Sequence, residues 1–247
     1  MGIGSPHLGI VACEVALDDA TARERWIGVL SEELWTSVWP DAERTMRTSL
    51  AVASHLADRH VDEARVGKSE WLFIEGYVFA NPETGQSAIR EAIRIAKAND
   101  TKVAITCSDA FIVNVFGDAL NAALQDADLF FCNETEACAV TGEETAEAAY
   151  RKLTETIPSV IVTNGPNGAY VKHGDVDTHV SAFDTNPKDL TGAGDMFAGS
   201  FLYGITHGVA PDKAARSAAF LSHKVISQVG ARLHHGTREF WDEGLNK

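Results

Sequence analysis

The chain has 247 residues, enough for one α/β domain with a substantial core, and 45% of them are hydrophobic, as in an ordinary soluble protein. Its formal net charge of −14 argues against nucleic acid or an anionic membrane as a partner, so an anionic substrate would have to be held by local groups. No apolar run reaches the roughly 18 residues of a membrane span and no secretory signal is visible, so we expect a cytoplasmic protein.

The first 40 residues differ in composition from the rest of the chain. Residues 20–34 have the spacing of an amphipathic helix, and three of the five tryptophans fall between Trp26 and Trp39. These tryptophans either pack on the core or mark a boundary near Pro40. We predict an atypical segment over residues 1–40 and one α/β domain over residues 41–247.

From residue 71 on, strands and helices alternate along the chain. Continuous apolar runs typical of buried parallel strands are separated by stripes with helical spacing. The predicted strands cover residues 71–77, 102–107, 128–132 and 160–163, with helices over residues 84–98, 111–125 and 143–156. This order predicts βαβ units and a mainly parallel sheet.

Polar residues follow three of these strands, and Ser108-Asp109, after the second, is expected to cap the next helix. Glu75 and Tyr77 end the first, where open α/β sheets place ligand contacts, although an exposed strand end is equally consistent. Asn133 and Glu136 follow the third, with the spacing of a helix-capping box, which is also suited to supporting a Mg²⁺ ion and its waters.

A glycine-rich turn follows the strand over residues 160–163 and leads into an expected hairpin over residues 169–181. Gly165 and Gly168 would let backbone groups approach a phosphate, although such turns are common. Neither a Walker A motif nor a G-x-G-x-x-G after the first strand is present, so neither a P-loop ATPase nor an NAD site is indicated.

The stretch from Asp189 to Asp195 places two glycines at the start of a helical run. Gly192 and Gly194 allow a close approach of the backbone, and helix N-termini offer unpaired N–H groups to an oxyanion. Asp195 would suit a base that takes a proton from a substrate hydroxyl. The alternative is a capped helix with an acidic first turn.

The sequence Asp-Leu-Thr-Gly-Ala-Gly-Asp over residues 189–195 resembles the C-terminal signature of the PfkB, or ribokinase-like, family of carbohydrate and nucleoside kinases, with Leu190 where Thr or Ser is usual. Asn133-x-x-Glu136 and the segment Thr163–Gly168 resemble two further family motifs in the expected order. The resemblance implies a ribokinase-like three-layer α/β/α sandwich with a Rossmann-like central sheet. We expect a truncated or absent lid, because no Gly-Gly sugar-binding turn stands near the start.

The resemblance also implies site residues and partners. Asp195 is then the catalytic base, and the backbone amides of Gly192, Ala193 and Gly194 form the anion hole. The residues implied to contact the nucleotide are Thr163, Gly165, Gly168 and Thr191, and those implied to support Mg²⁺ are Asn133 and Glu136. Asp189 corresponds to the position of a monovalent cation such as K⁺, and Glu75 and Tyr77 are expected to contact the substrate. ATP and a small sugar or nucleoside are the expected partners. A homodimer is a further expectation, although the sequence leaves the oligomeric state open.

Two functions are consistent with these residues. The first is an ATP-dependent kinase acting on an alcohol group of a sugar or nucleoside, in an adenosine kinase-like or a sugar kinase-like branch. The second is a catalytically impaired nucleotide-binding remnant of the family that acts as a binding or interaction protein.

Overall fold

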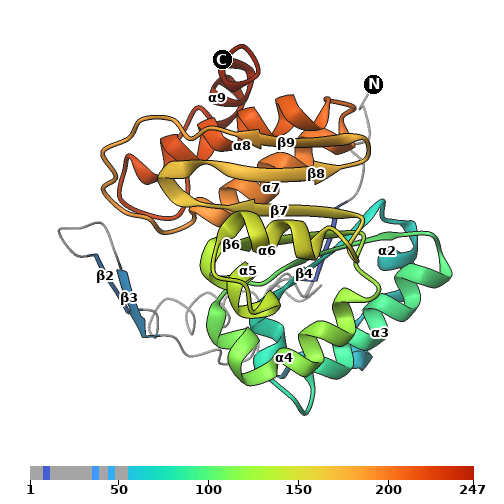
Figure 1. Ribbon diagram of the computed structural model, residues 1–247. Coiled ribbons are helices and arrows are strands. Elements are labelled where there is room, and N and C mark those ends of the chain that lie inside the picture. The colour runs from blue at the N-terminus through green and yellow to red at the C-terminus, as the bar shows by residue number, and fades with distance from the viewer. Residues whose placement is uncertain (1–7, 12–34, 39–43, 48–54) are drawn as a thin grey trace. The chain divides into compact units, whose positions relative to one another are not determined.

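The computed structural model describes the backbone of residues 8–11, 35–38 and 44–47 and all of residues 55–247 (Figure 1). The chain divides into two compact units, one of residues 1–35 and 47–130 and one of residues 36–46 and 131–247. The predicted helix over residues 20–34 lies outside the described residues. The predicted boundary at residue 40 stays a prediction.

The first unit contains three parallel strands. β4 (Trp71–Glu75) lies between β1 (Leu8–Val11) and β5 (Lys102–Thr106), with Ile10 opposite Phe73 and Phe73 opposite Ala104. The helices among the described residues of this unit are η2 (Asp58–His60), α2 (Glu63–Lys68), η3 (Gly76–Ala80), α3 (Gly85–Ala98) and α4 (Ala110–Leu124). Leu72 and Ile74 have no exposed surface, as the apolar run predicted for a buried strand.

Local side-chain chemistry sets the helix starts in this unit. The Asp109 carboxylate accepts a hydrogen bond from the Phe111 amide at 2.7 Å, so the expected cap of α4 is confirmed. The strand expected over residues 71–77 ends at Glu75, because the Gly76 amide donates to Ser108 Oγ at 2.9 Å and the chain turns into η3. Tyr77 therefore lies on a 3₁₀ turn rather than in the strand.

The second unit is built on a hairpin and on paired helices. β7 (Ser159–Thr163), β8 (Ala169–His173) and β9 (Val176–Val180) pair antiparallel in that order, and β6 (Leu129–Asn133) precedes them at the boundary of the two units. The helices are α5 (Glu134–Thr141), α6 (Ala146–Leu153), α7 (Ala193–Thr206), α8 (Pro211–Ile226) and α9 (Thr237–Gly244), with the turn η4 (Gly165–Asn167). A separate two-stranded sheet is formed by β2 (Trp35–Val38) and β3 (Arg44–Arg47).

Small residues let α7 and α8 pack closely. A Cβ atom on Gly204 would lie 2.6 Å from Cβ of Ala214, so this contact requires a glycine. Ser222 Oγ donates to the Ala193 carbonyl at 3.0 Å and ties α8 to the first turn of α7. In the described part of the chain no helix is long and apolar enough to cross a bilayer.

Replacement of Gly76 by alanine should destabilise the protein, because the new Cβ would lie 1.9 Å from the Cys107 carbonyl oxygen. We expect a loss of at least about 2 kcal/mol in the free energy of unfolding, measured by urea denaturation. Gly117→Ala is the matched control, since no atom lies within 4 Å of its added Cβ. A helical alanine there should stabilise by about 0.5–1 kcal/mol. Equal effects of the two changes would contradict the packing described for β4 and β5.

Candidate functional site

The start of α7 is held in one conformation by its glycine. Gly192 is the N-cap residue with φ +81°, and a Cβ there would lie 2.4 Å from the Ala231 carbonyl oxygen. A left-handed backbone and this close contact both require glycine. The next glycine differs, because a Cβ on Gly194 would meet no atom within 4 Å. Gly194 therefore borders open space where a ligand can approach the backbone.

The amides of this first turn are available to an anion. Amides at the start of a helix have no acceptor inside the helix and lie at the positive end of its dipole. The Ala193 amide donates a long hydrogen bond, 3.4 Å, to the Leu190 carbonyl oxygen. Gly194 and Asp195 are the next two residues of α7 and belong to the same first turn. Of the three predicted anion-hole residues, Gly194 has the most open surroundings.

The two aspartates of the signature have opposite environments. Asp189 is only 2% exposed, and its carboxylate accepts from the Thr191 amide at 2.9 Å and from the Gly230 amide at 2.8 Å. Asp195 is exposed in the first turn of α7. The buried carboxylate thus anchors the turn to the segment after α8, and the exposed one is accessible to a substrate.

Thr191 carries a polar atom with no partner. Its Oγ1 is buried, and among the described residues it is the one buried side-chain oxygen or nitrogen without a hydrogen bond. A buried hydroxyl normally has a partner. Its place beside Gly192 fits a ligand that supplies the missing hydrogen bond.

Asn133 and Glu136 form the capping box that their spacing predicts. The Asn133 side-chain oxygen accepts from the Glu136 amide at 2.9 Å, and the Glu136 carboxylate accepts from the Asn133 amide at 2.9 Å. Glu136 is 5% exposed, whereas Asn133 is exposed at the end of β6. Oxygen ligands of this kind suit the hydrated shell of Mg²⁺, so the pair fits the ion without binding it alone.

The glycine-rich turn after β7 combines one constrained and one open position. Gly168 has φ +96°, and a Cβ there would lie 2.1 Å from the Val180 carbonyl oxygen. Gly165 has φ +49° and no atom within 4 Å of a built Cβ. The Asn164 amide closes the turn on the Gly168 carbonyl at 2.7 Å, after Thr163 ends β7. The open space at Gly165 again admits a ligand close to the backbone.

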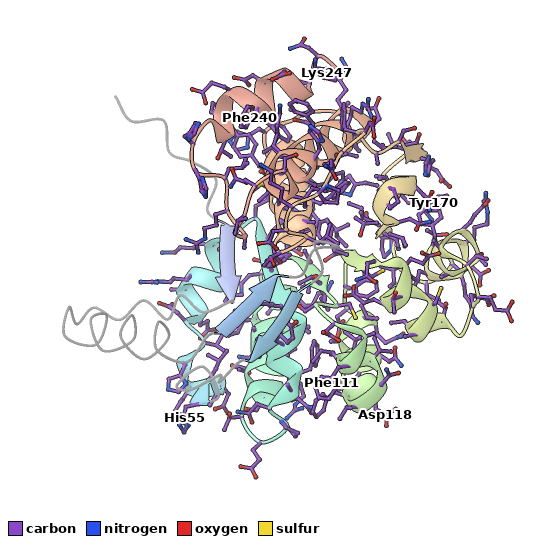
Figure 2. All side chains as sticks on the ribbon, turned by 90° about the vertical axis from the view of Figure 1, so that its left-hand side faces the viewer. His55, Phe111, Asp118, Tyr170, Phe240 and Lys247 are labelled. Carbon is purple, nitrogen blue, oxygen red and sulfur yellow. The ribbon has the colours of Figure 1, made fainter. Side chains whose placement is uncertain are left out.

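The predicted nucleotide, metal and catalytic residues all belong to the second unit. Glu75 and Tyr77 belong to the first unit and are placed relative to that unit alone. There, Tyr77 is 42% exposed, and Val115 of α4 is 55% exposed. Phe111, one turn earlier in α4 and labelled in Figure 2, is 51% exposed. Sequence periodicity assigned Phe111 only to a helix, and nothing in the pattern indicated its exposure.

Comparisons with known proteins identify the family to which this chain is similar. The sequence profile described as "pfkB family carbohydrate kinase" matches residues 35–236. The chain is 27% identical to the ribokinase of Haemophilus influenzae over 225 residues, which are 86% of this chain and 70% of that protein. It is 28% identical to an adenosine kinase of Dictyostelium discoideum over 210 residues, which are 77% of this chain but only 61% of that protein.

The fold is similar to that of a solved relative. The structure of adenosine kinase from Sinorhizobium meliloti superimposes with a TM-score of 0.81 at 27% identity, covering 96% of this chain and 76% of that chain. The likeness confirms the predicted ribokinase-like α/β fold with a mainly parallel sheet.

The different environments of Asp189 and Asp195 predict different effects of substitution on the free energy of unfolding. Asp189→Ala leaves two backbone amides without their acceptor, so we expect a loss of about 2–3 kcal/mol in the free energy of unfolding. Asp195→Asn changes an exposed side chain and should stay within about 0.5 kcal/mol of the unchanged protein. Urea denaturation of both variants gives the comparison, and a similar loss for both would contradict the assigned roles.

Proposed function

Because the chain belongs to the pfkB family of carbohydrate kinases, we propose that it transfers the γ-phosphoryl group of ATP to an alcohol of a sugar or nucleoside. The observation that carries this proposal is the signature turn, where an exposed carboxylate at Asp195 stands beside the open helix start at Gly194. The family's relatives include both a ribokinase and adenosine kinases, which supports both acceptor classes.

In the proposed reaction Asp195 accepts the proton of the substrate hydroxyl. The hydroxyl oxygen then forms a bond to the γ-phosphorus as the bond from that phosphorus to the β–γ bridging oxygen breaks, which releases ADP. The amides of Ala193 and Gly194 would stabilise the charge on the transferred group. This division of labour suits phosphoryl transfer, which depends mainly on positioning and charge stabilisation.

The nucleotide would bind beside the two glycine-containing turns, where its phosphates can come close to the backbone. Thr163, Gly165 and Gly168 would border its phosphates, and Thr191 would give its buried hydroxyl a partner there. When bound, Mg²⁺ neutralises phosphate charge, and Asn133 with Glu136 would hold its water shell. We keep Asp189 as a position near a monovalent cation such as K⁺, and Glu75 with Tyr77 as substrate contacts. The homodimer and the cytoplasmic location also stay predictions.

The alternative function is a nucleotide-binding protein without transfer. It is motivated by the first 40 residues, in whose sequence no Gly-Gly turn is found. In this alternative the bound nucleotide would be open to water, and transfer would be slow or replaced by hydrolysis. Release of ADP in Mg–ATP and potassium, measured across a panel of sugars and nucleosides, separates the two. Release that depends on one acceptor supports the kinase, and binding of ATP without it supports the alternative.

Removal of the proposed base should stop transfer without disturbing nucleotide binding. We expect Asp195→Asn to lower kcat by about 10²–10⁴-fold, the usual effect of losing a general base, with the affinity for ATP unchanged. Asp175→Asn, in the exposed β8–β9 turn, is the control and should keep its rate. Turnover of Asp195→Asn within tenfold of the unchanged protein would disprove the base assignment.

A methyl group at Gly194 should block the site while sparing the fold. The built Cβ contacts no protein atom, so Gly194→Ala should fold normally, but it would occupy the space offered to the phosphate. We expect kcat/KM for ATP to fall by at least about tenfold, a loss of roughly 1.4 kcal/mol in transition-state stabilisation.

Gly199→Ala is the matched control for this change. It lies in the same helix, and its Cβ also meets no atom within 4 Å. It should keep kcat/KM near that of the unchanged protein. Equal losses in both variants would mean that helix stiffening, and not a blocked phosphate position, explains the effect.

A further inference from the structure

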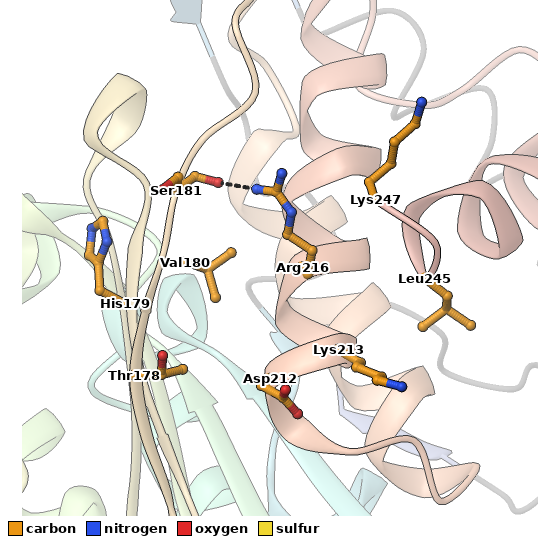
Figure 3. Close-up of a pocket in the computed structure, with 9 residues that line it drawn as sticks. All are labelled: Thr178, His179, Val180, Ser181, Asp212, Lys213, Arg216, Leu245 and Lys247. Atoms are coloured by element: carbon orange, nitrogen blue, oxygen red, sulfur yellow. Dashed lines mark hydrogen bonds between the residues drawn. The ribbon is translucent and has the colours of Figure 1, made fainter.

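A groove of about 500 Å³ lies in the second unit between β9 and the first turns of α8 (Figure 3). Thr178 and Val180 border it from the strand, and Lys213 with Arg216 border it from the helix. Leu245 and Lys247 close it beyond the end of α9. Its volume is within the roughly 300–1,000 Å³ of small-molecule sites.

The Arg216 guanidinium is already positioned in this groove. Its Nη1 donates to the Ser181 carbonyl oxygen at 2.7 Å, and its central carbon lies 3.9 Å from the centre of the Phe183 ring. The Ser181 carbonyl oxygen uses one of the five N–H groups of the guanidinium, so the other N–H groups can donate hydrogen bonds to a bound anion. Fixing the side chain in advance lowers the entropy lost on binding.

Positive charge gathers here on a chain whose net charge is −14. Lys213, Arg216 and Lys247 border the groove, and Asp212 is the one acidic side chain of its lining. Lys247 also lies 3.4 Å from Glu243 in an exposed ion pair. Neither Lys213 nor Arg216 forms an ion pair with another described residue. The groove therefore offers a local excess of positive charge with one guanidinium fixed in place.

This groove is distinct from the proposed nucleotide site. α8 meets the signature segment through its C-terminal half, where the Ile226 carbonyl accepts from the Lys188 amide at 2.8 Å and Ser222 donates to Ala193. The groove residues Asp212 and Lys213 lie in the first turn of the same helix. Arg216, the groove residue nearest to Ser222 along α8, precedes it by six residues, a rise of about 9 Å.

We propose that this groove is a second binding site that takes a small organic phosphate. Lys213 and Arg216, which form no ion pair with another described residue, match a ligand with more than one negative charge, and the Arg216 fork matches the paired oxygens of a phosphate. Val180 and Leu245 supply apolar surface for the organic part of the ligand. The site is independent of phosphoryl transfer, so it stands or falls separately from the kinase function.

The test is a titration of the ¹⁵N-labelled full chain with pyrophosphate, followed through the Arg216 Nε–H and the Lys213 and Arg216 amide signals. We expect saturable shifts at these signals, and at least tenfold weaker binding in the double variant Lys213→Ala/Arg216→Ala. The control Lys68→Ala/Arg90→Ala removes the same two charges from exposed positions of the first unit and should bind within twofold of the unchanged protein. Phosphoryl transfer should be unchanged in both double variants.

Three outcomes would overturn the proposal. Shifts confined to the signature turn would place pyrophosphate at the proposed transfer site alone. Equal weakening in both double variants would show a general effect of net charge. Stronger binding of citrate than of pyrophosphate would reject a phosphate as the ligand. Parallel titrations with AMP and ribose 5-phosphate then distinguish a nucleotide from a sugar phosphate.

Discussion

A buried carboxylate holds the signature turn in place. Asp189 accepts one amide from Thr191, within the turn, and one from Gly230, which lies 41 residues further along the chain in the segment after α8. Gly192 fits against Ala231 at the same junction. The start of α7 is consequently fixed, so its unpaired amides and Asp195 stay accessible without rearrangement. Such preorganisation is what charge stabilisation in phosphoryl transfer requires.

The glycines of the site divide into two kinds. At Gly168 and Gly192 the backbone is left-handed and another backbone atom lies where a Cβ would be, so these glycines serve the fold. At Gly165 and Gly194 the same position is open, but Gly165 has φ +49°, which itself favours glycine, so only at Gly194 of these four does neither packing nor backbone conformation explain the missing side chain. The two open glycines are in the two segments assigned to the nucleotide. Of these four positions, Gly194 is the one whose local structure supports the proposed function.

Much of this arrangement could be predicted from the sequence because the signals are local. The capping box at Asn133 and Glu136, the cap at Asp109 and the alternation of strands and helices all depend on neighbouring residues. The bond from Asp189 to Gly230 could not be predicted, since it depends on how α8 returns beside α7. The exposure of Phe111 and the groove beside β9 depend likewise on tertiary packing that no periodicity records.

If the signature turn and the glycine-rich turn after β7 form one nucleotide site, both turns should respond to the same ligand. The most direct test is to titrate the full chain with Mg²⁺ and a non-hydrolysable ATP analogue while following backbone amide signals. We predict saturable shifts with one dissociation constant at Gly194 and at Gly165. Nucleotide binding that shifts only one of the two turns, or neither, would contradict a shared site.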